Sequence, residues 1–399
     1  MTANVSEAAI GIHDLALATG HHVLDLRQLA EHNGSEVDKY YIGIGQSQMS
    51  VAAEDEDVVT LGASAARRLL DRRADGAGHP VRTLLFATES GIDQSKSAGV
   101  YVHRLLGLDP ACRVVELKQA CYSATAALQF ALGLVARDRR ESVLVIAADV
   151  ARYPLDSPGE ATQGAAAAAF LVGADPALVA IEPATGLHTD DVHDFWRPND
   201  RSEAIVDGKR SLGSYLRSLE GSWLDYRGRG GVDFEAIDRF CYHQPFTKMA
   251  RKAHDRLCRI VGAALGPEDR ARQLGASLEL NRRLGNSYTA SLYLGLLSLL
   301  EGERGLGGSR VGFFSYGSGS VSEFFTGVVR PGYESVVRAA EDEQILARRV
   351  PVSYERYSAL HRKVDEVAGT DYATAAETTG PFRFAGVEGS VRRYERRAA

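Results

Sequence analysis

The chain has 399 residues, of which 45% are hydrophobic and 25% charged, and its formal net charge at pH 7 is −6. This composition is typical of a soluble globular protein with room for two domains. The acidic balance argues against a nucleic-acid-binding protein, which would usually be basic. The amino terminus lacks the basic and apolar regions of a secretory signal. The apolar stretch near residue 290 contains Tyr293, Gly295 and Ser298, so we expect a buried helix there rather than a membrane span.

The cysteines indicate a reduced, cytoplasmic protein. No two of them form a CxxC pair, and their spacing fits no metal site. A disulfide framework is not expected in so long a chain, and free thiols are typical of the cytoplasm. The four are Cys112, Cys121, Cys241 and Cys258.

The first third of the chain predicts strands that alternate with helices. A weak strand signal at 9–15 and a bend at 40–45 come first, and a helix is expected at 51–72. Glycines and a proline at 76–80 then break the chain. The apolar run 81–87 predicts a buried strand that ends just before Glu89. Open α/β sheets place their chemistry at such strand ends, although Glu89 also suits the N-cap region of a helix that runs to 106.

A cysteine follows the second strand of this region. The run 114–117 predicts a strand, and small residues after Cys121 begin a helix whose apolar face includes Ala127, Ala131 and Val135. A thiol at a helix start faces the positive end of the helix dipole, which favours the nucleophilic thiolate. The alternative is a small buried residue, since free cysteine is often buried.

The middle of the chain extends the pattern and then changes character. A third strand at 142–148 ends at Asp149, which predicts βαβ units with a largely parallel sheet. A Gly-containing turn at 159–164 precedes a strand at 165–172. Residues 182–232 are polar and aperiodic until a helical stretch at 212–226, so we expect an insertion or cap over the sheet.

The last part adds further candidate groups. His243 follows a strand-like run, and Lys248 and Lys252 lie one helical turn apart, where they could bind phosphate or form a solvated basic face. We expect helices at 267–284 and 291–300, with Asn286 in the turn between them. Strands are expected at 310–315 and 323–329 with a Gly/Ser loop at 316–320, which offers backbone N–H donors. The charged tail from 333 contains a helical segment at 352–367 and ends in a basic stretch, 392–397, that we expect to be solvated.

These features occur together, and in order, in one known family. The chain resembles 3-hydroxy-3-methylglutaryl-CoA (HMG-CoA) synthase of the bacterial type along almost its whole length. The stretches that carry the resemblance are IGIGQSQMSVA (42–52), ATESGIDQSKSA (87–98), ELKQACYSATAALQ (116–129), ARYPLDSPGEATQGAAA (151–167), DFWRPN (194–199), YHQPFTKMARKA (242–253), GNSYTASLYLGLLSLLE (285–301) and FFSYGSGSVSEFF (313–325).

The resemblance implies an α/β, thiolase-like fold with αβαβα layers built from two related halves, usually in a homodimer. The amino-terminal half, 1–175, would carry Glu89 and Cys121. The carboxy-terminal half, 176–399, would carry His243, Asn286 and Ser318, with the cap at 182–232. The residues 1–5 are expected to be disordered.

The resemblance also implies a reaction of the mevalonate pathway. The enzyme would be an acyltransferase that condenses acetyl-CoA with acetoacetyl-CoA and water, with no metal or other cofactor. Cys121 would take the acetyl group, Glu89 would remove a methyl proton, and His243 would bind the second thioester and assist protonation of the new hydroxyl. The remaining implied roles are an acyl contact (Asn286), an oxyanion hole (the Ser318 and Cys121 N–H groups), the acyl pocket (Thr162 and Tyr153) and CoA contacts (Lys248 and Lys252).

Other functions stay open from the sequence. The related synthase that acts on carrier-protein-bound polyketides uses the same Cys, Glu and His, but it often lacks the lysine after His-x-Pro that Lys248 supplies here. An initiating ketoacyl-carrier-protein synthase would need a second histidine and an Asn in place of Glu89. An inactive thiolase-fold scaffold that only binds a partner is the non-enzymatic alternative, and the intact Cys, Glu and His argue against it.

Overall fold

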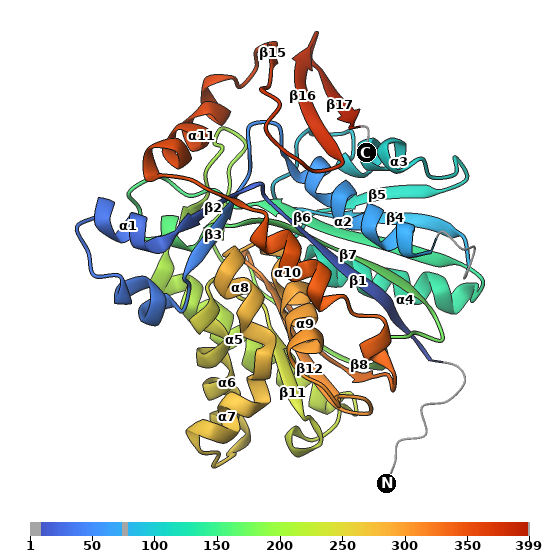
Figure 1. Cartoon of the computed structure of the whole chain (residues 1–399). Helices are drawn as coiled ribbons and strands as arrows, with labels where there is room; N and C mark the ends of the chain where they lie inside the picture. Colours follow the sequence, from blue (N-terminus) through green and yellow to red (C-terminus); the bar gives the residue numbers. More distant parts are fainter. Residues whose placement is uncertain (1–8, 74–78, 398–399) are drawn as a thin grey trace.

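The computed structural model describes residues 9–73 and 79–397, and it centres on a twisted nine-stranded sheet (Figure 1). The strand order is β11-β12-β13-β8-β1-β7-β6-β4-β5. β4 pairs in parallel with β5 and β6, which confirms the parallel arrangement expected there, whereas β7 is antiparallel to both of its neighbours. The strands are β1 (Ile10–Thr19), β4 (Val81–Ala87), β5 (Arg113–Leu117), β6 (Ser142–Val150), β7 (Ala165–Ala174), β8 (Val179–Thr189), β11 (Arg239–Tyr242), β12 (Arg310–Gly317) and β13 (Val321–Val329).

Helices cover both faces of this sheet and create the layered arrangement. Along β4, Leu84 and Phe86 pack toward α2 (Val58–Arg72) and α3 (Ala98–Leu106), while Leu85 and Ala87 face the opposite side. That side is filled by α4 (Ser123–Arg137) and α9 (Ser291–Gly302). At the other end of the same sheet, β11–β13 pack on a further pair of helices, α5 (Gly208–Gly228) and α6 (Thr247–Val261). The result is a mixed α/β fold of the thiolase-like αβαβα type, as expected.

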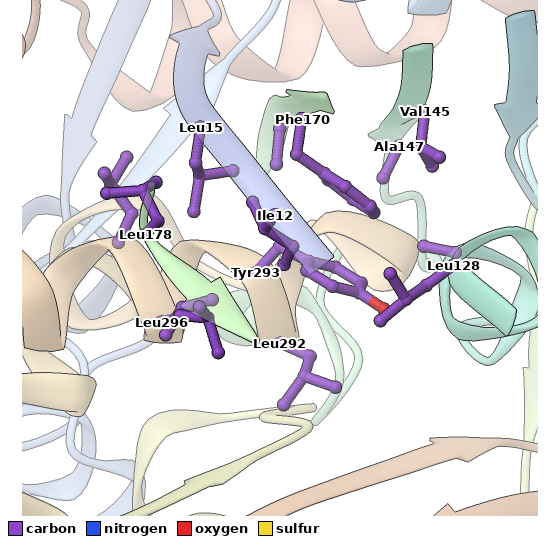
Figure 2. Packing of buried hydrophobic residues seen from close by; sticks show 14 of the residues in the cluster. Ile12, Leu15, Leu128, Val145, Ala147, Phe170, Leu178, Leu292, Tyr293 and Leu296 are labelled. Carbon is purple, nitrogen blue, oxygen red and sulfur yellow. The ribbon is translucent and has the colours of Figure 1, made fainter. Parts of the chain in front are cut away.

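The central helices α4 and α9 are locked together in the apolar core (Figure 2). Tyr293 of α9 stacks on Phe170 of β7, with 4.4 Å between ring centroids. Its hydroxyl lies 3.0 Å from the hydroxyl of Thr125 in α4. α4 begins just after Cys121, and α9 begins shortly after Asn286. The packing of the two helices in this core therefore fixes the segments that contain these two residues.

Three sequence expectations are wrong. Residues 182–189 are not part of a cap, because they continue β8, which pairs with β13. The expected helix 267–284 is broken into α7 (Pro267–Leu274) and α8 (Glu279–Leu284), since Gly275 adopts φ 51°. The helix expected at 51–72 begins only at Val58, because Asp57 forms a capping box there, and Val51 instead ends β3 (Gln48–Val51).

The basic end of the tail is also not simply solvated. β17 (Val391–Arg396) pairs with β16 (Phe382–Glu388). The Tyr394 hydroxyl donates to Asp57 at 2.6 Å, and Arg392 donates to Asp93 at 3.2 Å. The tail therefore closes against the amino-terminal part of the chain, near α3 (Figure 1).

The smaller elements complete the chain. They are β2 (His22–Asp25), α1 (Leu26–His32), a π-helical turn (Lys39–Ile44), β9 (Phe195–Trp196), β10 (Ile205–Val206), α10 (Ala339–Ala347), β14 (Val350–Pro351), α11 (Tyr354–Glu366) and β15 (Tyr372–Ala373). The residues 1–5, the breaker glycines Gly76 and Gly78, and residues 398–399 lie outside the described part of the chain. Within 9–73 and 79–397, no helix has the length and apolar character to cross a bilayer.

Candidate active site

Cys121 lies in the short connection between β5 and α4. Its side chain is 8% exposed, and the preceding Ala120 has a left-handed φ of 45°. The turn is held by Ser123, whose hydroxyl accepts from the Gln119 N–H at 2.6 Å and donates to the Ala120 carbonyl at 2.8 Å. The thiol is therefore placed by a bent, hydrogen-bonded turn immediately before the helix.

Glu89 reaches the same point from the end of β4. The Cys121 thiol and the Glu89 carboxyl group lie against each other, close enough for each to shift the pKa of the other. The Oε2 atom of Glu89 is buried without a hydrogen-bond partner. A thiol and a carboxylate in direct contact, with one oxygen still free, can exchange protons with a bound substrate.

Asp149, at the end of β6, holds the Glu89 loop. Its Oδ1 accepts from the Thr88 hydroxyl (2.8 Å), the Glu89 N–H (2.9 Å), and both the N–H (2.9 Å) and hydroxyl of Ser90. Its Oδ2 accepts from the N–H (3.0 Å) and hydroxyl (2.5 Å) of Thr289. This fully buried carboxylate thus joins the Glu89 loop to the segment that precedes α9.

Cys121 opens into a cavity of about 1020 Å³. Aromatic rings of Tyr153, Phe195 and Tyr288 cluster around the thiol. The expected site residues that line the cavity are Cys121, Tyr153, Thr162, His243, Asn286 and Ser318. Of the described clusters of His, Cys, Asp and Glu, none has three members placed to hold a metal ion.

The far wall is built from segments after residue 190. The His243 main chain is held on both sides, because its N–H donates to the Phe314 carbonyl (2.8 Å) and its carbonyl accepts from the Tyr215 hydroxyl (2.7 Å). The Asn286 N–H donates to the Thr162 carbonyl at 2.8 Å. The Ser318 loop is fixed by buried Asp194, which accepts from the Tyr316 hydroxyl (2.6 Å) and the Gly319 N–H (2.9 Å).

The chain matches known proteins along nearly its full length. Residues 7–177 match the family model "Hydroxymethylglutaryl-coenzyme A synthase N terminal", and residues 179–260 and 264–380 match its C-terminal counterpart. A hydroxymethylglutaryl-CoA synthase of Enterococcus faecalis is 38% identical over 96% of this chain and 99% of that protein. The chain belongs to the HMG-CoA synthase family.

Solved structures agree with this membership. An HMG-CoA synthase complexed with CoA has 36% identity and a TM-score of 0.90, over 97% of this chain and 100% of that one. The carrier-protein branch is also similar. The polyketide 3-hydroxy-3-methylglutaryl-ACP synthase PksG of Bacillus subtilis is 34% identical over 88% of both chains. This synthase is thus an acyltransferase of the condensing type.

The two lysines lie outside the described lining of the cavity. Lys248 donates from Nζ to the Ile42 carbonyl at 3.3 Å, and so contacts the π-helical turn. The ammonium of exposed Lys252 lies 5.4 Å from the ring centroid of Phe246, which does line the cavity. Lys252 therefore lies beside a residue of the cavity lining, Lys248 contacts the π-helical turn, and neither residue lines the cavity with Cys121.

The electrostatics of this synthase correct one sequence inference. Burial, reinforced by the neighbouring Glu89 carboxylate, raises the pKa of Cys121 well above its ordinary value, so the helix start does not favour a resting thiolate. Burial, followed by the Asp149 charge, raises the pKa of Glu89 to about 8. Burial lowers the pKa of His243 to about 3. Near neutral pH the site therefore holds a thiol, a neutral imidazole and a Glu89 side chain that is mostly protonated with a minor ionised fraction.

Several site residues were not predicted as such from the sequence. Asp149 and Asp194 were noticed only as a strand end and as part of a polar stretch, yet both organise loops that carry site residues. Tyr288 and Phe195 complete the ring cluster at the thiol. An acid after a buried strand is a usable signal for Asp149, and the other three lie in the stretches 194–199 and 285–301, which carry the resemblance but were given no role for these residues.

Proposed function

We propose that this synthase condenses acetyl-CoA with acetoacetyl-CoA and water to give HMG-CoA and free CoA through an acetyl-Cys121 intermediate. The observation that carries the proposal is the contact of Cys121 with the Glu89 carboxyl group, because Cys121 lines the same cavity as His243 and Asn286. Covalent catalysis of this kind divides one difficult condensation into easier steps.

The first step transfers the acetyl group. The Cys121 sulfur attacks the thioester carbonyl as its proton passes to Glu89 in its ionised form. Glu89 then gives that proton to the departing CoA thiolate, so CoA leaves as its thiol and the carboxylate is restored. Glu89 is the group in contact with the thiol. The tetrahedral oxyanion needs preorganised donors, each worth roughly 3 kcal/mol. The N–H groups of Cys121 and Ser318 suit this role, since the Ser318 carbonyl accepts from the Gln119 amide at 3.3 Å and the two loops thus lie together.

The next steps form the carbon–carbon bond and release the product. Glu89 takes a proton from the acetyl methyl, and the resulting enolate attacks the ketone carbon of acetoacetyl-CoA. The new alkoxide takes a proton, with His243 assisting. Water then cleaves the thioester and restores the Cys121 thiol. A neutral His243 can donate one N–H to the ketone without placing a buried charge there.

Other residues serve binding in this proposal. The amide oxygen of Asn286 already accepts from the Tyr288 N–H at 2.9 Å, so its NH2 group is the donor left for an acyl oxygen. Tyr153 and Thr162 line the acyl pocket, although the Thr162 hydroxyl also donates to the Gly159 carbonyl at 2.7 Å. Lys248 and Lys252 contact the CoA phosphates at the mouth.

Product formation from free CoA thioesters tests the proposal. Purified protein with both thioesters should release CoA thiol and produce HMG-CoA, as measured by mass spectrometry. The same assay with acetyl-carrier protein covers the second candidate, polyketide β-branching, which the 34% identity to PksG supports. Turnover with carrier-bound substrates alone would move the assignment to that branch, and no turnover with either would overturn the enzymatic function.

We further propose a cytoplasmic homodimer with two related halves that divide at residue 175. All four cysteines are free, as a reducing compartment requires. β5 lies at one edge of the sheet, and Val115 on it is 43% exposed. A second copy paired along β5 would cover this edge.

A further inference from the structure

Helix α11, from the tail of the chain, lies directly behind the cavity wall that contains Tyr153. The His361 Nε2 lies 2.9 Å from the Tyr153 carbonyl oxygen. On the other side of the same residue, the Tyr153 N–H donates to the Gln163 Oε1 at 2.7 Å. The Gln163 amide in turn donates to the Tyr357 hydroxyl of α11 at 2.5 Å. Both main-chain polar groups of Tyr153 are therefore held by side chains outside the cavity.

The side chain of Tyr153 faces the reacting thiol. It is 6% exposed and belongs to the same apolar cluster as Cys121, Phe195 and Tyr288. The centroid of its ring lies 5.8 Å from that of Phe195 and 6.3 Å from that of Tyr288. Because the ring is wedged between other rings, a displacement of the Tyr153 main chain moves the wall against which an acetyl group on Cys121 would lie.

His361 is suited to act as a fixed donor. It is 9% exposed, and burial lowers its pKa to about 4, so the ring is neutral in the physiological range. A carbonyl oxygen can only accept, so the proton of the neutral ring must be on Nε2. The backbone carbonyl of His361 itself accepts from Arg152 at 2.8 Å, which fixes α11 to the residue next to Tyr153.

We propose that His361 is a positioning residue for acyl transfer, which holds the Tyr153 main chain and thereby the cavity wall beside Cys121. The inference rests on the proposed function, because it concerns the acetyl group that Cys121 would carry. Small displacements of a reacting group can cost up to about 100-fold in rate. We expect loss of the His361 donor to slow acetyl transfer by about tenfold or more, with less change in the KM for acetyl-CoA.

The test compares His361→Leu with His361→Gln. Glutamine can place an N–H donor near the Nε2 position, whereas leucine cannot, so acetyl-Cys121 formation should slow in the first variant and stay near wild type in the second. His13→Leu, on β1, is the matched control, since the His13 Nε2 also lies 2.7 Å from a main-chain oxygen, that of Ala174 on β7. It should lower thermal stability without slowing acetylation. Equal acetylation rates in the Leu and Gln variants would overturn the proposal.

A second measurement keeps the test decisive if His361→Leu does not fold. His361 borders a second cavity, of about 550 Å³, through which a small molecule can approach the space left by His361→Ala. Added imidazole should restore the acetylation rate of that variant, whereas furan, a ring of similar size without an N–H donor, should not. Equal rescue by both, or by neither, would show that the donor is not what matters. Wild-type protein is measured in parallel, because its failure to form the adduct would count against the proposed function instead.

Discussion

The Glu89 loop and the lysine pair at the cavity mouth are built in opposite ways. Glu89 belongs to a loop whose N–H and hydroxyl groups converge on one fully buried carboxylate, Asp149. Within the described part of the chain the Lys248 ammonium has one hydrogen bond, of 3.3 Å, to a main-chain oxygen, and Lys252 is exposed beside a phenylalanine ring. The difference suggests that the reacting groups are fixed before substrate arrives, whereas the cations order around it. Changes at the loop should therefore affect the rate constant, and changes at the lysines should affect binding.

The largest expected effect is that of Glu89→Gln on condensation. The amide retains the shape of the side chain but cannot accept the methyl proton, so the rate of HMG-CoA formation should fall by about 10²- to 10⁴-fold. The rate is measured by CoA release with both thioesters. Glu235→Gln, a change of the same type at an exposed position, is the control. Wild-type turnover in Glu89→Gln would remove the base from this account.

Asp149→Asn should come next. Both oxygens of Asp149 accept hydrogen bonds, whereas the asparagine side chain has one accepting oxygen and one NH2 group. In either orientation of the asparagine amide, the NH2 group would face donors that have lost their acceptor. We expect the free energy of unfolding to fall by about 3 kcal/mol and condensation to slow by about 100-fold. Denaturant unfolding and the CoA-release assay measure the two effects. Thr88→Val removes only one donor to Asp149 and should cost about 1 kcal/mol. If the two variants were equally stable, Asp149 would not be the organising group.

Glu89 should also make stability depend on pH. The Glu89 carboxyl group has a pKa of about 8 in the folded chain and an ordinary pKa of 4.5 in the unfolded chain. Between these two pH values the folded chain retains a proton on Glu89 that the unfolded chain has released. Stability therefore falls as pH rises from about 4.5 to about 8, by at most roughly 1.4 kcal/mol per pH unit from this group. Glu89→Gln should accordingly gain thermal stability relative to wild type at pH 8, and gain little at pH 5. Equal gains at both pH values would contradict the raised pKa.

The smallest effects should be at the mouth. Lys248→Ala and Lys252→Ala should each raise the KM for acetyl-CoA by about two- to tenfold with kcat unchanged, because an exposed ion pair contributes little and acts equally on substrate and transition state. Steady-state kinetics with acetylpantetheine, which lacks the nucleotide, provide the control, since its KM should not change. A fall in kcat in either variant would contradict the assignment of the two lysines to binding and of the Glu89 loop to the rate constant.

The sequence is informative where a local pattern determines the structure. The strands before Glu89 and Asp149 and the helix after Cys121 follow from their apolar periodicity, and the structure confirms them. Residues 182–189 appeared to be a cap because this half-exposed stretch of β8 is polar, and its place in the sheet depends on pairing with β13, far away in the sequence. The tail was expected to be solvated for the same reason, because Tyr394 donates its hydrogen bond to Asp57, which is far away in the sequence.

The sequence predicted which residues form the site better than it predicted their protonation states and supporting contacts. The motif order brought Cys121, His243 and Asn286 together in the resemblance, and in the structure all three line one cavity. The state of the thiol could not be read from its position before a helix. Burial and the Glu89 charge oppose the helix dipole, and both depend on three-dimensional packing. Asp194 likewise acquires its role through its contacts with the Tyr316 hydroxyl and with the Gly319 N–H, the latter across 125 residues of chain.

The central claim is that Cys121 carries the acetyl group. The most direct test is the intact mass of purified protein after brief incubation with acetyl-CoA alone, followed by peptide mapping. We predict one acetyl group on the peptide that contains Cys121, and none in Cys121→Ala, with Cys112→Ala labelled as in wild type. An unlabelled wild-type protein that nevertheless produces HMG-CoA, or an adduct that persists in Cys121→Ala, would contradict the account.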